Sequence, residues 1–174
     1  MSEPEDKTGN SGDYSEASAA PEGESSPLDN ARSEKFLIFS IMNKFYCFSS
    51  RLIGEIAVYD AVYPLPLMPP YILGVVNRYS IPYALFDIGI LFHKTPSPRK
   101  KLLVFKDEID RIAVLIDDVS GIADIDTDEI ITVEKNIDSG ELTEAVSASF
   151  YWNGKDVFVL DINRIIERVS REIE

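Results

Sequence analysis

The chain has 174 residues, of which 45% are hydrophobic, and a formal net charge of −13 at pH 7. This charge argues against the clustered Lys and Arg that phosphate binding needs, so we predict no nucleic-acid partner. No apolar run approaches the roughly 20 residues that span a membrane, and the N-terminus lacks the apolar segment of a signal peptide. We therefore expect a cytoplasmic protein without direct membrane insertion, whose one cysteine, Cys47, is buried as a small hydrophobe.

The first 34 residues differ in composition from the rest of the chain. Residues 1–34 carry nine Asp or Glu against Lys7 and Arg32, with few large apolar side chains. Such a segment cannot bury enough surface to offset its ordering entropy, so we predict a disordered acidic tail. A folded domain is expected over residues 35–174, in halves at roughly 35–100 and 101–174 that follow one another or interleave.

Short runs typical of β-strands begin at Lys35. Phe36–Phe39 and Phe45–Phe48 flank a turn and predict a hairpin, and Gly54–Tyr59 predicts a further strand. Four prolines lie between positions 60 and 70. Because proline lacks the N–H group that a strand ladder needs, this segment is expected to be a loop.

The stretch Pro69–Phe92 predicts more elements of structure than any other part of the chain. It predicts a strand through Gly74–Val76, a tight turn at Asn77–Ser80, a second strand and a short helix that opens at Asp87. A loop is expected from His93 to Pro98. The remaining strands and a final helix are predicted at Leu102–Phe105, Arg111–Ile116, Val119–Ile125, Val146–Trp152, Asp156–Leu160 and Ile162–Ile173.

The chain contains an internal echo in three blocks that keep their order. The matched blocks are Lys35–Phe39 with Lys101–Phe105 and Ile53–Ala57 with Val119–Ala123, at an offset of 66, and Leu85–Ile88 with Val159–Ile162, at an offset of 74. Two such units are too few for a solenoid, which needs at least three repeats. They fit two related β-barrels that pack together.

Groups suited to catalysis or metal binding are sparse. His93 is the only histidine and has no Ser-His-Asp context, so we expect an ordinary surface histidine rather than a general base. Asp124–Asp128 resembles the start of a calcium loop, but Glu129 and Lys135 stand where that loop needs Gly and Glu. Asp117 and Asp118 would point to opposite faces of a strand. We predict no enzyme activity, cofactor or metal, and a protein-binding role instead.

Residues 35 to about 168 resemble the CheW-like coupling domains of bacterial chemotaxis along their whole length. The resemblance rests on Phe36–Phe48, Ile53–Ile56, Pro69 with Gly74–Asn77, Ile81–Ile88 and Val157–Ile162, taken in that order. It implies an all-β fold of two SH3-like five-stranded β-barrels on a shared core, with short helices and a C-terminal helix. It also implies a non-enzymatic adaptor that couples the cytoplasmic tip of a chemoreceptor to the regulatory domain of the histidine kinase CheA.

Matching positions imply which residues contact these partners. They are Ile53, Glu55, Ile56, Gly74 and Asn77, to which we add Arg78 and Tyr79 from the turn. The family usually has Asn-Leu-Arg-Gly at this turn, whereas this chain has Asn77-Arg78-Tyr79-Ser80. Glycine suits turns that need a positive φ, which serine resists. Arg78 stands one position before the family arginine, so we expect it on the opposite face of a regular strand.

Other classes of protein remain open from the sequence. One alternative is a divergent paralogue in an accessory motility pathway, which the altered turn would suit. Another is a standalone SH3-like peptide-binding module, for which the chain offers five tyrosines between positions 59 and 83. A small β-barrel enzyme would show a deep pocket of converging polar groups instead of an apolar groove.

Overall fold

The computed structural model describes residues 32–59, 61–94, 101–106, 108–133 and 144–173. The predicted acidic tail up to residue 31 and most of the predicted loop at 93–98 lie outside these ranges. In chain order the elements are β1 (Ser33–Ile41), β2 (Lys44–Ser49), the 3₁₀ helix η2 (Ser50–Leu52), β3 (Ile53–Val58), β4 (Ile72–Arg78), β5 (Ile81–Phe86), α1 (Ile88–His93), β6 (Lys101–Phe105), β7 (Ile112–Ile116), β8 (Asp118–Asp126), the 3₁₀ helix η3 (Thr127–Glu129), β9 (Ile131–Thr132), β10 (Val146–Trp152), β11 (Lys155–Leu160) and α2 (Ile162–Ile173).

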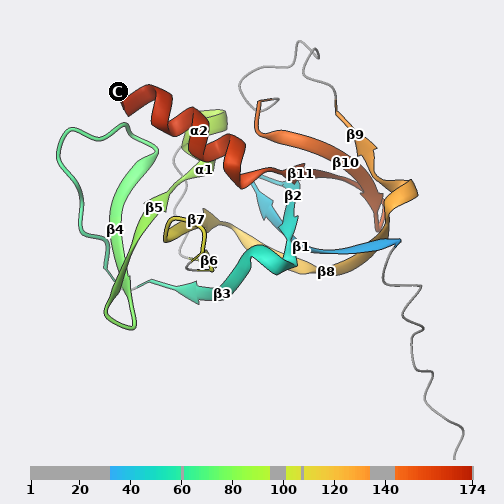
Figure 1. Ribbon diagram of the computed structural model, residues 1–174, viewed down its shortest axis with the longest axis horizontal. Coiled ribbons are helices and arrows are strands. Elements are labelled where there is room, and N and C mark those ends of the chain that lie inside the picture. The colour runs from blue at the N-terminus through green and yellow to red at the C-terminus, as the bar shows by residue number, and fades with distance from the viewer. Residues whose placement is uncertain (1–31, 60, 95–100, 107, 134–143, 174) are drawn as a thin grey trace, which may run out of the picture.

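The strands form two sheets, and the prediction of an all-β fold is confirmed. The first sheet has the order β8-β1-β2-β11-β10-β9, and the second has the order β3-β6-β7-β5-β4. The sheets lie side by side and α2 runs across both (Figure 1). The first sheet has six strands where five were predicted, because the two-residue β9 adds to the edge of β10.

The two sheets repeat one topology. Each has an antiparallel hairpin at its centre, β1–β2 or β6–β7. On one side of this hairpin, each sheet has a parallel strand pair, β2–β11 or β7–β5, which leads into a second hairpin. On the other side, each sheet ends at a strand, β8 or β3, that pairs with the first strand of the central hairpin. The internal echo therefore corresponds to a structural repeat, in which both sheets take strands from both halves of the chain.

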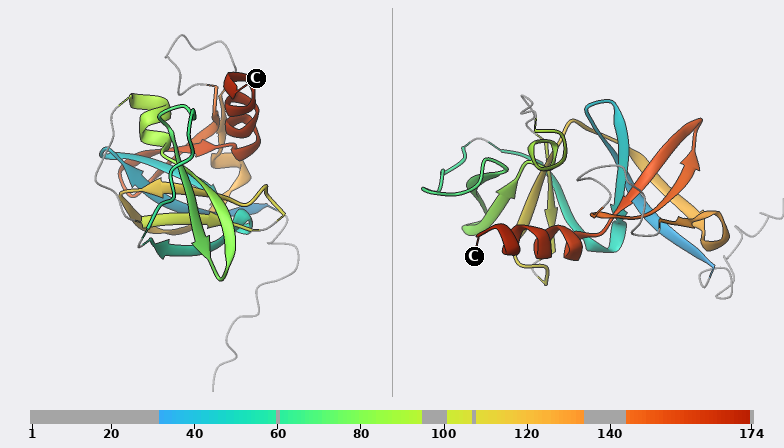
Figure 2. Two further views of the ribbon diagram at one scale, coloured as in Figure 1. Left: turned by 90° about the vertical axis from the view of Figure 1, so that its left-hand side faces the viewer. Right: turned by 90° about the horizontal axis from the view of Figure 1, so that it is seen from above.

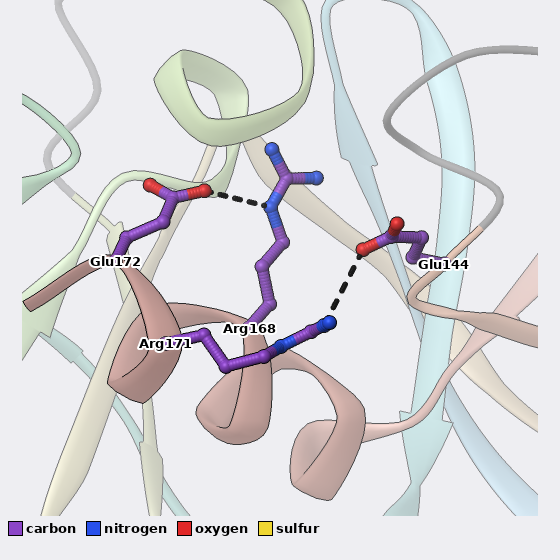
Figure 3. A pocket seen from close by; sticks show the side chains of 4 residues that line it. All are labelled: Glu144, Arg168, Arg171 and Glu172. Carbon is purple, nitrogen blue, oxygen red and sulfur yellow. Dashed lines mark hydrogen bonds and ion pairs between the residues drawn. The ribbon is translucent and has the colours of Figure 1, made fainter. Parts of the chain in front are cut away.

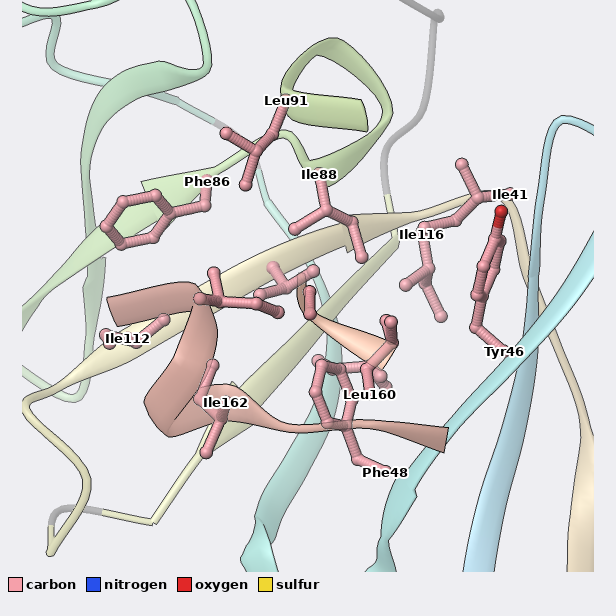
Figure 4. Packing of buried hydrophobic residues seen from close by; sticks show 14 of the residues in the cluster. Ile41, Tyr46, Phe48, Phe86, Ile88, Leu91, Ile112, Ile116, Leu160 and Ile162 are labelled. Carbon is pink, nitrogen blue, oxygen red and sulfur yellow. The ribbon is translucent and has the colours of Figure 1, made fainter. Parts of the chain in front are cut away.

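The central strands of the two sheets have continuous apolar sequences because both of their faces are buried. On β1, Leu37 and Phe39 face a core shared by the two sheets, while Phe36 and Ile38 face a core inside the first sheet. The shared core joins β1, β2, β6, β7 and both helices (Figure 4). Phe48 of β2 and Phe105 of β6 meet edge-on in it, with ring centroids 4.9 Å apart. This contact fastens one sheet to the other.

Each helix begins at an aspartate that follows the last strand of a second hairpin. The Oδ1 atom of Asp87 accepts hydrogen bonds from the backbone N–H of Gly89 at 2.8 Å and Ile90 at 3.1 Å. Asp161, the equivalent residue at the offset of 74, accepts one from Asn163 at 2.9 Å. Both side chains satisfy N–H groups that a helix start leaves without intrahelical partners.

The helix α2 ties the first sheet to the second (Figure 2). Its buried side chains Ile165 and Val169 pack into the shared core. At its far end, the Tyr71 hydroxyl donates a hydrogen bond of 2.6 Å to Glu172, which also accepts from Arg168 at 3.4 Å. Because Tyr71 leads into β4, these bonds anchor the end of α2 to the second sheet.

This anchor is expected to weaken at alkaline pH. Burial, and then the hydrogen bond to Glu172, raise the pKa of Tyr71 above its ordinary value of 10.0. A raised pKa adds stability that is present below pH 10 and is lost as the pH rises toward the folded-state pKa. We expect wild type to lose about 1 kcal/mol more than Tyr71→Phe between pH 10 and pH 11, measured by urea unfolding. Equal losses would contradict the anchor.

Two local predictions differ from the structure, and a third is confirmed. His93 is the last residue of α1 rather than the start of a loop, and its Nε2 lies 3.2 Å from the Tyr46 hydroxyl. The strand predicted from Arg111 begins at Ile112, because Asp110 and Arg111 form a turn with φ of +40° and +50°. The prediction for Cys47 is confirmed, since this residue is fully buried and its burial raises the pKa of the thiol.

Candidate partner-binding site

The turn between β4 and β5 has a backbone that its residues disfavour. Tyr79 and Ser80 have φ of +51° and +67°. Positive φ at both central residues defines a type I′ hairpin turn, which favours Asn-Gly. The equivalent turn between β10 and β11 is Asn153-Gly154, with φ of +48° and +80°. One turn geometry is thus built twice, once with suitable residues and once with Tyr and Ser.

Exchanging these turns is expected to change stability in opposite directions. Left-handed conformation costs an ordinary residue roughly 1–2 kcal/mol, and Asn and Gly avoid most of that cost. Tyr79→Asn with Ser80→Gly should therefore raise the free energy of unfolding by about 1 kcal/mol, after loss of the contact between Tyr79 and Arg78. Asn153→Tyr with Gly154→Ser should lower it. Urea unfolding measures both, and changes of the same sign would contradict the comparison.

An ion pair lies beside the β4–β5 turn. Arg78, the last residue of β4, pairs with Glu55 of β3, and its Nε donates to Glu55 Oε2 at 3.3 Å. The Arg78 Cζ lies 5.3 Å from the Tyr79 ring centroid, and the Tyr79 hydroxyl lies 3.5 Å from Glu55 Oε1. The hydrogen bonds with Glu55 raise the pKa of Arg78 above its usual value.

The ion pair joins the two edges of the second sheet, because β3 and β4 are its outer strands. Glu55 lies two residues before the buried Ala57, and Arg78 lies two residues after the buried Val76. Alternate strand residues share a face, so both charged side chains lie on the side of the sheet that holds its core. Glu55 is therefore half-buried and turned toward Arg78.

The equivalent end of the first sheet is closed by a different contact. Gly121 matches Glu55 at the offset of 66, and Trp152 matches Arg78 at the offset of 74. A Cβ atom on Gly121 would lie 3.4 Å from the Trp152 ring, so this ring packs where a side chain would otherwise stand. The repeated fold thus closes one sheet end with an aromatic ring and the other with an ion pair.

Only some of the predicted contact residues come together. Glu55, Arg78 and Tyr79 converge, and Tyr79 is 83% exposed. Ile56 points outward from β3 with 48% exposure, and Asn77 is exposed on β4. The remaining two predicted residues, Ile53 and Gly74, lie in packed surroundings: Ile53 packs against the shared core and Gly74 is buried.

Gly74 allows the backbone at Tyr63 and Pro64 to come close to β4. Its φ is +133°, and a Cβ atom there would lie 2.2 Å from the Tyr63 carbonyl oxygen and 2.7 Å from the Pro64 Cα. Tyr63 and Val75 exchange two backbone hydrogen bonds of 2.8 Å across the same place. This bridge, which the sequence prediction missed, holds the proline-rich segment against β4. Leu65, Leu67 and Met68 are exposed along that segment.

The tyrosines predicted to support a peptide groove do not share one surface. Tyr71 and Tyr83 are buried, whereas Tyr63 and Tyr79 are exposed. The arrangement therefore does not favour an aromatic groove for proline-rich ligands.

A surface pocket of about 270 Å³ lies along α2, lined by Glu144, Arg168, Arg171 and Glu172. These side chains pair with one another, Arg168 with Glu172 at 3.4 Å and Arg171 with Glu144 at 3.6 Å (Figure 3). Within the described ranges, no three His, Cys, Asp or Glu side chains are grouped to hold a metal ion. In the same part of the chain, no helix is long and apolar enough to cross a membrane.

The two interlocked sheets, each with one parallel strand pair and a capped helix, define an all-β domain of duplicated topology. The CheW-like domain family matches residues 35–170, which is most of the sequence. The chain belongs to the CheW-like domain family, and the predicted resemblance is confirmed. This places it among the scaffold and adaptor proteins of chemotaxis signalling.

One solved structure that resembles the chain is that of scaffolding protein TtCheW from Thermoanaerobacter tengcongensis, with a TM-score of 0.66 and 15% sequence identity. The match covers 74% of this chain and 84% of TtCheW. At this identity the likeness shows the fold. No curated protein sequence matches the chain.

Proposed function

We propose that this protein is a non-enzymatic adaptor that couples chemoreceptors to the histidine kinase CheA. The observation that carries the proposal is the family match over residues 35–170. An adaptor needs surfaces rather than a reaction centre. The residues that converge on the surface at the β4–β5 turn, Glu55, Arg78 and Tyr79, form a contact patch and not a catalytic constellation. The partners are the cytoplasmic tip of a chemoreceptor and the regulatory domain of CheA.

The proposal places the protein in the cytoplasm, at membrane-associated receptor arrays. Of the predicted contact residues, Ile56, Asn77 and Tyr79 are exposed enough to meet a partner directly. Glu55 and Arg78 form the half-buried ion pair beside them. Ile53 and Gly74 support the surface through packing, so changes there would alter binding through the fold.

Calorimetric titration of the purified chain tests the proposal. The titrants are the cognate receptor tip and the cognate CheA regulatory domain, each measured separately, with an unrelated helical hairpin and an unrelated SH3-like domain as controls. We expect saturable binding of both cognate partners and none of the controls. Absence of binding to both cognate partners would refute the proposal. Co-purification with the kinase of another motility pathway would favour the divergent paralogue.

A further inference from the structure

Each sheet has a second hairpin whose outer strand, β4 or β10, is covered along its free edge at the same place. In the second sheet Tyr63 bridges to Val75 of β4, and in the first sheet Ile131 of β9 pairs with Ser149 of β10. Val75 and Ser149 are equivalent at the offset of 74. We infer that the bridge at Tyr63 is an edge cover, which keeps β4 from pairing with β4 of a second copy of this chain.

An uncovered β4 would be a template for strand pairing. Ile72–Asn77 is a run without charge, and the one charged residue of the strand, Arg78, is already paired with Glu55. The chain carries −13, so net charge repels a second copy, yet two β4 strands would meet without like charges in contact. An antiparallel pair centred on Val75 sets this β-branched side chain against its copy. Exposed, uncharged edge strands are the surfaces through which proteins assemble strand to strand.

The bridge occupies the backbone groups that such pairing would use. Val75 donates its N–H to the Tyr63 carbonyl and accepts from the Tyr63 N–H, both at 2.8 Å. Groups that face one edge recur at every second residue of an antiparallel strand, so the Asn77 N–H lies along the same edge. Asn77 is opposite Pro82, which has no N–H to donate, as expected for a pair without mutual hydrogen bonds. A second strand would need Val75 and Asn77 together, and the bridge withholds Val75.

The edge cover does not create a new edge in its own place. Pro64 follows Tyr63 directly and Pro66 comes soon after, and neither has an N–H to donate to a further strand. In the first sheet β9 achieves the same result by its shortness, since it consists of Ile131 and Thr132 alone. Prolines and very short strands are two of the ways in which natural sheets block strand addition. The repeated fold therefore protects the same edge twice with different residues.

Two variants open the edge cover in different ways. Gly74→Ala places a Cβ atom 2.2 Å from the Tyr63 carbonyl oxygen, and Tyr63→Pro removes the N–H that bonds to Val75. Asn77→Pro, combined with each of them, takes the next donor from the edge of β4 without costing a bond to β5. The control is Ile165→Ala, a core truncation in α2 that lowers stability and leaves the edge cover intact. Sedimentation velocity over a concentration series measures particle mass, and hydrogen exchange measures protection of the Val75 amide.

We expect wild type and Ile165→Ala to sediment as a single copy at every concentration. Gly74→Ala and Tyr63→Pro should lose protection of the Val75 amide by at least about tenfold when dilute, and should shift to two or more copies as the concentration rises. Adding Asn77→Pro should raise the concentration needed for this association by at least about tenfold.

Several results would overturn the inference. They are an opened variant that stays a single copy over the whole series, association that Asn77→Pro leaves unchanged, and equal association of Ile165→Ala. Unchanged protection of Val75 in both Gly74→Ala and Tyr63→Pro would also overturn it, because the bridge would then not be what shields this amide. None of these results bears on binding of the receptor tip or of CheA, so the proposed function is tested separately.

Discussion

Gly74→Ala is expected to lower the free energy of unfolding by about 3 kcal/mol or more. The added Cβ would lie 2.2 Å from the Tyr63 carbonyl oxygen, and the neighbouring atoms are backbone, which cannot swing aside. Overpacking costs about 1–3 kcal/mol, and the positive φ of +133° adds strain to any residue with a side chain. The substitution should therefore break the bridge between Tyr63 and Val75.

Gly54→Ala is the matched control for this substitution. Gly54 lies on β3 of the same sheet, but the nearest atoms to its added Cβ are 3.6 Å away, which is ordinary contact. We expect its unfolding free energy to stay within about 0.5 kcal/mol of wild type in urea. If Gly74→Ala were as stable as the control yet failed to bind partners, Gly74 would be a contact residue rather than a packing one.

Glu55→Lys is expected to lower stability by about 2 kcal/mol and partner affinity by at least about tenfold. It removes one partner of a half-buried ion pair and places two cations side by side at the edge of the second sheet. Breaking a fully buried pair costs about 3–5 kcal/mol and an exposed one at most about 1 kcal/mol, so solvent screening puts this pair between them. Urea unfolding and calorimetric binding measure the two effects.

The exchanged pair Glu55→Arg with Arg78→Glu separates the two ways in which Glu55 can matter. If Glu55 acts by holding Arg78, the exchange restores more than half of the lost stability and of the lost affinity. If the Glu55 carboxylate itself contacts a partner, stability returns and affinity does not. The second outcome would contradict the internal role of this ion pair.

The sequence predicted the strands well where local chemistry decides the structure. Asp87 marked the start of the first helix, and the repeated blocks anticipated the repeated sheets. Such signals depend on a few neighbouring residues, whose preferences act before the chain is compact.

The sequence could not predict contacts that depend on the curvature of the second sheet, which brings its two outer strands together. Glu55 and Arg78 are 23 positions apart on strands that share no ladder, so their pairing has no local signal. The bridge at Tyr63 lies within a proline-rich segment that argued for a loop. Only the contact between Gly121 and the Trp152 ring, seen in the structure, shows what the offsets of 66 and 74 mean for the equivalent residues Glu55 and Arg78.

Coupling of two partners by one chain is the central claim, and sedimentation velocity tests it most directly. Fluorescently labelled CheA regulatory domain is mixed with the cognate receptor tip, with and without this protein. We predict that the labelled domain sediments with the receptor tip only when this protein is present, as one species that contains all three. Two separate binary complexes, or no change in the sedimentation of the labelled domain, would contradict the claim.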